Sequence, residues 1–511
     1  MQALPLRHKI GQLLMAGFDG HEPDAHIERL IRQHHLGGVI LFRRNIQAPA
    51  QTAALNRRLQ EINAEQSDIP LLIAVDQEGG VVARIEAGVT PLPSALAFRT
   101  AGSAVDCEAL TQIANEELRV LGFNVNFAPV LDVNNNRRNP VIGVRAYGET
   151  VAEVCEYGLA AQRGIQSAGI AATAKHFPGH GDTAVDSHLG LPRVGHERAR
   201  LEAVELAPFR AAIAAGVDAI MSAHVVFPAF EPDPDTPSTL SPAVMTGLLR
   251  RELGFDGVVF TDCLEMAAIA EGVGVVEGAV RAFKAGVDVL LVSHREDRQV
   301  AVIEALCAAV EKGEISEARI DESLARILKL KQARGMAGWR ALPFDVASHI
   351  AQPQSLALSR RIHAAAIVWQ GEPIRLDPVQ PVLVITLEVR EHTEIDVVSV
   401  GEDTLGGCLA NRGMTVRELR LPLAPSTADM VVALEHARDA GQVVCVSYNA
   451  VLWPEQQALL AALPGSKTWL VAGRLPYDMD LQPQARGRLA GCSNRPAMLL
   501  ALADALLARQ E

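Results

Sequence analysis

The sequence is poor in cysteine, and the cysteines it has follow no recognisable spacing. Seven are scattered along 511 residues, and none forms a CxxC pair. An odd and dispersed set argues against a disulfide framework and against a zinc ribbon. We therefore expect a protein of a reducing compartment.

Long hydrophobic runs are also missing. No stretch reaches the roughly 18 uninterrupted apolar residues of a membrane span. The apolar run from Leu13 to Phe18 is shorter than the apolar region of a secretory signal, so we interpret it as a strand. These features predict a soluble, cytoplasmic protein without a membrane partner.

Positive charge is in deficit. Lys and Arg number 47 against 60 Asp and Glu, which gives a formal charge of −13. Nucleic acids and anionic membranes need basic surfaces, so neither is expected as a partner. Because 49% of the residues are hydrophobic and 21% charged, the chain can bury a large core, and global disorder is excluded.

What the sequence does contain is a series of short apolar runs separated by amphipathic helical segments. Eight such runs within roughly the first 300 residues predict an α/β fold with a closed (β/α)8 barrel, for which we assign residues 1–336. An open doubly wound sheet is the alternative. The runs are Leu13–Phe18, Gly38–Phe42, Leu71–Val75, Asn124–Ala128, Ile170–Ala174, Ala219–Ser222, Val258–Thr261 and Val289–Val292.

Polar residues follow the carboxyl ends of these runs, and their placement favours the barrel. In a barrel those ends surround a single mouth, whereas an open sheet collects side chains only at one switch point. Asp132 and His224 are expected to line the mouth as supporting residues. The full set is Asp76, Asp132, Lys175, His176, His224, Asp262 and His294.

The last third of the chain is organised differently. A helix over residues 316–331 is expected to close the barrel, and residues 337–356 lose periodicity and are interpreted as a linker. Residues 357–511 then alternate strand-like and helical segments, which predicts a second, smaller α/β domain. It contains no P-loop and no GxGxxG motif.

The segment AKHFPGHGDTAVDSHLGLP, residues 174–192, is the densest cluster of titratable groups. Proline and glycine prevent a helix there, so we expect a shaped loop. A metal site is one interpretation, although the helical HExxH spacing is absent. The other is a dyad in which Asp186 orients His188 as a general acid and base.

Asp262 stands where the seventh run ends, in GFDGVVFTDCLEM. It could cap the helix expected just after it, or it could face the barrel axis as a carboxylate nucleophile. A carboxylate nucleophile with a separate proton donor is the equipment of a retaining glycosidase.

Four motifs together resemble glycoside hydrolase family 3, and within it the β-N-acetylglucosaminidase branch. They are KHFPGHGDT followed by DSH, DQEGG (76–80), NPVIGVRAYG (139–148) and GFDGVVFTDCLEM (254–266). The second domain, with GRLPYD (473–478), is similar to the C-terminal α/β sandwich of two-domain members. The resemblance implies a TIM-type barrel followed by that sandwich.

The resemblance also implies residue roles. Asp262 would be the nucleophile, and His188 the acid/base paired with Asp186. A salt-bridge ring that braces the mouth is the alternative role for the sugar-binding set. Two departures stand out, since Cys263 and Val81 occupy positions where many relatives have Asp and Arg. The implied sugar-binding residues are Asp76, Arg84, Arg145, Lys175 and His176.

The implied activity is that of a retaining exo-enzyme that removes terminal N-acetylglucosamine from muropeptides or chitooligosaccharides, as in peptidoglycan recycling. No metal and no organic cofactor is expected. With 4% aromatic residues, a small polar pocket is favoured over a long stacking platform. The second domain would serve structure, packing or dimerisation, in a monomer or homodimer.

Several other functions stay open at this point. One is a phosphorylase, because a histidine donor carries less negative charge than a carboxylate and would let phosphate approach. Others are a metal-dependent barrel hydrolase and a non-catalytic sugar-sensing protein. A substrate-assisted hexosaminidase using Glu296 and Asp297 is disfavoured, because that pair lies in a charged run typical of a solvated helix start.

Overall fold

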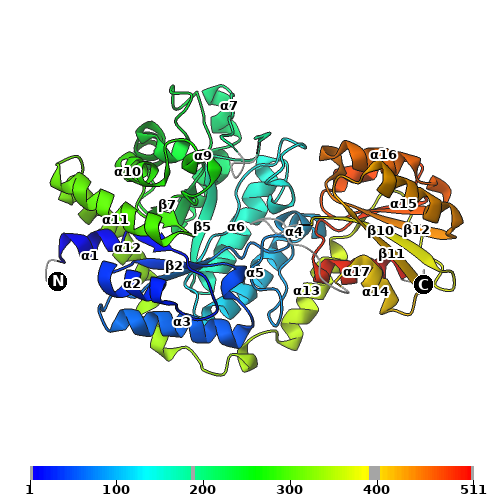
Figure 1. Cartoon of the computed structure of the whole chain (residues 1–511), viewed down its shortest axis with the longest axis horizontal. Helices are drawn as coiled ribbons and strands as arrows, with labels where there is room; N and C mark the ends of the chain where they lie inside the picture. The colour runs from blue at the N-terminus through cyan, green and yellow to red at the C-terminus, as the bar shows by residue number, and fades with distance from the viewer. Residues whose placement is uncertain (1–3, 186–189, 391–402, 508–511) are drawn as a thin grey trace.

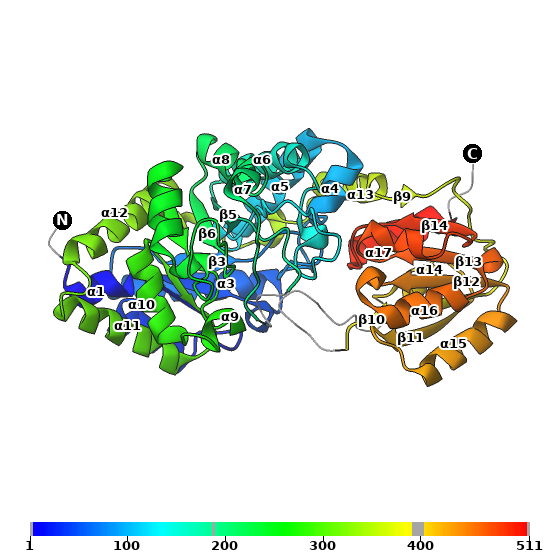
Figure 2. The same cartoon turned by 90° about the horizontal axis from the view of Figure 1, so that it is seen from above.

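Two α/β units make up the chain in the computed structural model, which describes residues 4–185, 190–390 and 403–507. Figure 1 shows the larger, N-terminal unit beside a smaller one formed by the C-terminal third, and the view from above in Figure 2 shows the same arrangement. Each unit has a sheet of its own, with eight strands in the first and six in the second.

The first unit is a nearly closed parallel barrel. Its strands follow one another around the sheet, and β1 pairs with both β2 and β8. Between β7 and β8 a bridge from Phe260 to Val289 completes the ring. The strands are β1 (Leu14–Ala16), β2 (Gly38–Leu41), β3 (Leu72–Val75), β4 (Val125–Asn126), β5 (Ala171–Phe177), β6 (Ala219–Ser222), β7 (Val258–Phe260) and β8 (Leu290–Val292).

Helices cover the outside of the barrel, because each β-strand leads into a segment with one apolar face that packs on the sheet. All eight strands are buried over their whole length, as expected of a parallel sheet covered on its outer side. The helices are α1 (Leu6–Gly11), α2 (Ala25–His34), α3 (Pro49–Ala64), α4 (Ala95–Ala101), α5 (Ala104–Val120), α6 (Val151–Ser167), α7 (Arg198–Ala203), α8 (Ala207–Ala214), η4 (Ala243–Glu252), α9 (Ala267–Ala270), α10 (Val275–Ala285), α11 (Glu296–Glu311) and α12 (Glu317–Ala333).

The second unit is a six-stranded sheet in the order β11-β10-β12-β13-β14-β9, parallel except for the β14–β9 pair. Its core contains side chains from the barrel unit as well, including Val81, Val82 and Val144. Its elements are α13 (Pro353–Ala365), β9 (Val368–Trp369), β10 (Val382–Glu388), α14 (Leu405–Ala410), β11 (Val416–Pro422), α15 (Thr427–Asp439), β12 (Gln442–Ser447), α16 (Pro454–Ala462), β13 (Thr468–Ala472), β14 (Gly487–Ala490) and α17 (Pro496–Leu507).

The predicted fold class, a (β/α)8 TIM-type barrel followed by a smaller α/β domain, is confirmed. The closing helix is α12. Residues 337–356 contain two short 3₁₀ segments and the start of α13, and the domain boundaries at 336 and 356 stay predictions. Among the described residues, no helix is both long and apolar enough to cross a membrane.

Candidate active site

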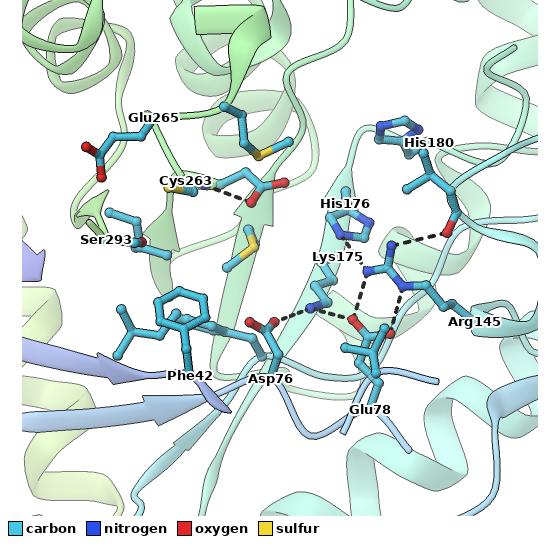
Figure 3. A pocket seen from close by; sticks show the side chains of 18 of the residues that line it. Phe42, Asp76, Glu78, Arg145, Lys175, His176, His180, Cys263, Glu265 and Ser293 are labelled. Carbon is cyan, nitrogen blue, oxygen red and sulfur yellow. Dashed lines mark hydrogen bonds and ion pairs between the residues drawn. The ribbon is translucent and has the colours of Figure 1, made fainter. Parts of the chain in front are cut away.

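A pocket of about 230 Å³ opens at the carboxyl ends of the barrel strands. Active sites of such barrels lie at this face, because the loops that follow the strands meet there. Figure 3 shows a charged group of side chains on one side of the pocket and a thiol, a hydroxyl and a carboxylate on the other. Lining residues include Phe42, Asp76, Glu78, Arg84, Arg145, Lys175, His176, His180, Asp262, Cys263, Glu265, Ser293 and His294.

The charged side is a chain of ion pairs. The Lys175 Nζ atom donates to Asp76 Oδ1 at 2.7 Å and also lies 2.7 Å from Glu78 Oε1. The Arg145 guanidinium donates to both carboxylate oxygens of Glu78, at 2.9 and 2.8 Å. Arg84 lies 3.7 Å from Asp76. Two acidic and three basic side chains therefore form one row at the pocket wall, of which Figure 3 shows Asp76, Lys175, Glu78 and Arg145.

The neighbouring charges of this buried row shift the pKa values of Glu78 and Lys175. Burial alone would raise the pKa of Glu78, but the charges of Arg145 and Lys175 outweigh it and hold that pKa far below its usual range. Burial would lower the pKa of Lys175, yet Asp76 and Glu78 raise it above its usual value. Glu78 and Lys175 therefore stay ionised at neutral pH, and they present a fixed acceptor and a fixed donor to a ligand.

His176 is held from behind by Asp132. Its Nδ1 lies 2.7 Å from Asp132 Oδ2, and its Nε2 lies 3.3 Å from the Arg145 guanidinium. Since arginine can only donate, Nε2 accepts and Nδ1–H donates to Asp132. Asp132 is fully buried and does not line the pocket, so the expectation that it lines the mouth is wrong. It orients His176 instead.

His180 sits beside His176 with the rings edge to face. Burial, together with the neighbouring His176, lowers the pKa of His180 to about 4. Its Nδ1 pairs with Thr183 Oγ1 at 2.8 Å. His180 is thus a neutral group at physiological pH.

Glycines bring these loops together. A Cβ on Gly181 would lie 1.8 Å from the carbonyl oxygen of Val133, and one on Gly79 would lie 2.3 Å from that of Pro93. Gly79 also has φ +102°, a conformation that L side chains rarely adopt. The close backbone approach at these two positions therefore requires glycine.

Asp262 lines the opposite side of the pocket, just beyond β7. Its Oδ1 accepts a hydrogen bond from the Cys263 amide at 2.8 Å. Helix α9 begins at Ala267 with Met266 as its N-cap, so the helix-capping alternative for Asp262 is wrong. Burial raises the pKa of the Cys263 thiol to about 12, so this thiol is protonated at neutral pH and is not an anionic nucleophile.

His224 contacts the backbone of the segment that carries Asp262 and Cys263. It is buried, its Nε2 lies 3.0 Å from the Cys263 carbonyl oxygen, and its Nδ1 lies 2.8 Å from Thr239 Oγ1. It does not line the pocket, contrary to expectation.

The predicted dyad, Asp186 and His188, lies outside the described residues, so its placement stays a prediction. The flanking parts of the same loop are described. Asp182 pairs with His196, and the Asn139 amide donates to the carbonyl oxygens of His180 and Gly181, both at 2.9 Å. The base of the loop is thereby fixed on both sides of the undescribed residues.

The second unit reaches two of the pocket loops. Tyr477 donates to Glu149 at 2.6 Å and accepts from Asn134 at 3.2 Å, and these two residues lie at the ends of the loop that carries Arg145. Leu475 contacts the same loop at Gly143. The loop of Asp76 to Arg84 contributes Val81 and Val82, which pack in the second unit's core.

All five predicted sugar-binding residues, Asp76, Arg84, Arg145, Lys175 and His176, meet at this pocket. Four of them, Asp76, Arg84, Arg145 and Lys175, are joined through ion pairs in the network that was the alternative role, and their sugar-binding role stays a prediction. Glu78 was missed. It lies in the DQEGG motif two residues after Asp76, and only its partners, Lys175 and Arg145, show its importance.

Residues 5–330 match the family model described as "Glycosyl hydrolase family 3 N terminal domain". The chain belongs to glycosyl hydrolase family 3. The predicted resemblance is thereby confirmed, and with it the expectation of a glycoside hydrolase.

Full-length similarity extends to a solved structure of a family 3 β-N-acetylglucosaminidase from Paenibacillus sp. str. FPU-7. The two chains are 48% identical with a TM-score of 0.93, over 99% of this chain and 97% of that one. This likeness includes both units.

Two curated relatives match 60% and 65% of this chain. Beta-hexosaminidase A of Pseudoalteromonas piscicida is 39% identical over 326 residues, which are 60% of this chain and 54% of the relative. The chain therefore spans about half the length of that relative. A beta-hexosaminidase of Xylella fastidiosa (strain 9a5c) is 38% identical over 65% of this chain and 95% of its own length.

Proposed function

We propose that this family 3 enzyme is a retaining exo-β-N-acetylglucosaminidase, which hydrolyses terminal non-reducing N-acetylglucosamine through a covalent glycosyl-enzyme. The observation that carries the proposal is the position of Asp262 at the end of β7, in the same pocket as the Asp76–Lys175–Glu78–Arg145 row. The 48% identical β-N-acetylglucosaminidase from Paenibacillus supports N-acetylglucosamine as the sugar that is released.

In the first step, the Asp262 carboxylate attacks the anomeric carbon while His188 donates a proton to the leaving oxygen. In the second step, His188 accepts a proton from water, the water oxygen attacks the same carbon, and the Asp262 carboxylate leaves. Two displacements give net retention. Asp186 would stabilise the charged form of His188 in both steps.

The charged row would bind the sugar. Asp76 accepts hydrogen bonds from ring hydroxyls, and Lys175 and Arg145 donate to hydroxyl or acetamido oxygens. Because these side chains are already held by one another, little ordering is needed on binding. The pocket, at about 230 Å³, is smaller than the roughly 300–1,000 Å³ of typical ligand sites, which suits one terminal sugar.

Muropeptides or chitooligosaccharides would supply that terminal sugar, in cytoplasmic recycling of the cell wall. Products from GlcNAc-anhydro-muropeptide and chitobiose, each with and without phosphate, would identify the aglycone and the acceptor. Free N-acetylglucosamine as the main product supports hydrolysis. Sugar 1-phosphate as the main product would mean a phosphorylase instead.

The role of His188 is tested by leaving-group dependence. His188→Ala should slow hydrolysis of a substrate with a poor leaving group by about 10²–10⁴-fold, and much less for a nitrophenyl glycoside, whose leaving oxygen needs no proton. Equal losses on both substrates would contradict a general-acid role. His349→Ala, which removes an exposed histidine of the segment before α13, is the control.

A further inference from the structure

A cluster of three potential metal ligands lies on the side of the pocket opposite the charged row. One donor atom from each of Cys263, Glu265 and His294 lies within 4.8 Å of the other two. Cys263 and Glu265 belong to the segment between β7 and α9, and His294 follows β8. All three side chains line the pocket.

The spacing is close to what a zinc ion requires. With Zn–S near 2.3 Å and Zn–N and Zn–O near 2.0–2.2 Å, donor atoms of a tetrahedral site lie roughly 3.5 Å apart. The three donor atoms lie within 4.8 Å of one another, so small adjustments of all three side chains would bring them to these distances. A thiol, an imidazole and a carboxylate together suit zinc and related borderline cations better than magnesium or calcium.

Outer contacts orient the carboxylate. Glu265 is almost completely buried at its side chain, with Arg298 at 3.2 Å from one oxygen. Its other oxygen accepts from the His294 amide at 2.6 Å. Hydrogen bonds of this kind, which fix a ligand's orientation, are typical of working metal sites.

The position gives the cluster a consequence for catalysis. Cys263 follows Asp262 directly, and its amide holds the Asp262 carboxylate at 2.8 Å. A dication bound here would attract that carboxylate and occupy part of the space that a sugar needs. An ion with three protein ligands keeps a fourth position open, and because all three ligands line the pocket, a bound sugar would lie beside such an ion.

We propose that Cys263, Glu265 and His294 form an inhibitory site for Zn²⁺ or a similar thiophilic divalent cation, beside the nucleophile. Binding exchanges the Cys263 thiol proton for the metal, since the thiolate is the ligand. The proposal goes beyond the hydrolase activity, and its first test needs no substrate.

Cobalt is the direct probe, because a Co²⁺–thiolate bond gives a charge-transfer absorption that oxygen and nitrogen ligands do not. The wild type should develop this band on titration with Co²⁺, and Zn²⁺ should displace it. Cys263→Ser should lose the band, whereas Cys307→Ser, a matched change of another partly buried thiol on α11, should keep it. A wild type without the band, or a band that survives in Cys263→Ser, would overturn the proposal.

Zinc affinity and inhibition give the second readout. His294→Ala should weaken Zn²⁺ binding, measured by competition with a chelating dye, by more than the roughly 10–100-fold expected for a lost outer contact such as Arg298→Gln. Zn²⁺ should inhibit the wild type reversibly and spare Cys263→Ser. Equal inhibition of both enzymes would contradict the site, while an inactive wild type that still shows the cobalt band would contradict only the proposed function.

Discussion

Within the described residues, every side chain that lines the pocket comes from the barrel, whereas the second unit touches only the loops around it. The barrel places Asp76, Lys175 and Asp262 at or just beyond strand ends, and it places Glu78, Arg84 and Arg145 on the loops that follow the strands. The second unit contributes Tyr477 and Leu475 against the Arg145 loop and an apolar cover over Val81 and Val82. Reacting groups and supporting contacts are thus divided between the two units.

This division predicts that barrel substitutions change the chemical step and that second-unit substitutions change binding. The largest effect is expected for Asp262→Ala, which should reduce kcat by on the order of 10⁴-fold or more. Added azide should restore turnover and give the α-glycosyl azide, because it attacks the face that the carboxylate has vacated. An Asp262→Ala enzyme with wild-type turnover would rule out the assigned nucleophile.

The next largest effect concerns the buried charges. Glu78→Gln leaves Lys175 and Arg145 without a shared anion, so denaturant unfolding should show a loss of about 3–5 kcal/mol together with a raised KM. Glu304→Gln breaks an exposed pair with Arg7 and should cost at most about 1 kcal/mol. Similar losses of unfolding free energy in both variants would contradict a larger contribution from the buried ion pairs than from an exposed one.

A pH effect of about 3 kcal/mol is expected from His180. Its folded pKa of about 4 lies below the unfolded value near 6.5, so the unfolded chain binds the proton first as pH falls. Stability should therefore decline from pH 6.5 to 4, with no further loss from this residue below pH 4. The decline should shrink in His180→Gln, as thermal melts across that range would reveal. If stability declined equally with falling pH in His180→Gln and in the wild type, the decline would come from other titratable groups.

The smallest effect tests the second unit. Tyr477→Phe removes the hydrogen bonds to Glu149 and Asn134 and should cost about 1 kcal/mol, with a few-fold rise in KM and little change in kcat. Tyr448→Phe is the matched control, because the Tyr448 hydroxyl accepts from Arg474 within the second unit. If both variants left KM unchanged, the second unit would not position the Arg145 loop.

Much of the fold could be predicted from the sequence, because buried parallel strands are continuous apolar runs that periodicity detects. The eight barrel strands fall within the predicted runs, apart from the longer carboxyl end of β5. Strand β9 (Val368–Trp369) was missed because two residues are too short for a periodic signal, and β14 (Gly487–Ala490) because two of its four residues are glycine and arginine.

The site was less completely predictable. Motifs located Asp76, Arg145 and Lys175, but the importance of Glu78 arises from charges 67 and about 100 residues away. Tyr477 meets its partner Glu149 across 328 residues, and no local pattern encodes such a contact. The metal-ligand cluster likewise needs His294 brought from the next strand to Cys263 and Glu265.

The most direct test of the central claim is to map the covalent intermediate. The enzyme would be quenched in acid during turnover of an activated N-acetylglucosaminide, digested and analysed by mass spectrometry. One N-acetylglucosamine residue should be found esterified to Asp262. A sugar adduct on another residue such as Glu265, or no adduct under conditions where product forms in a burst, would contradict the account.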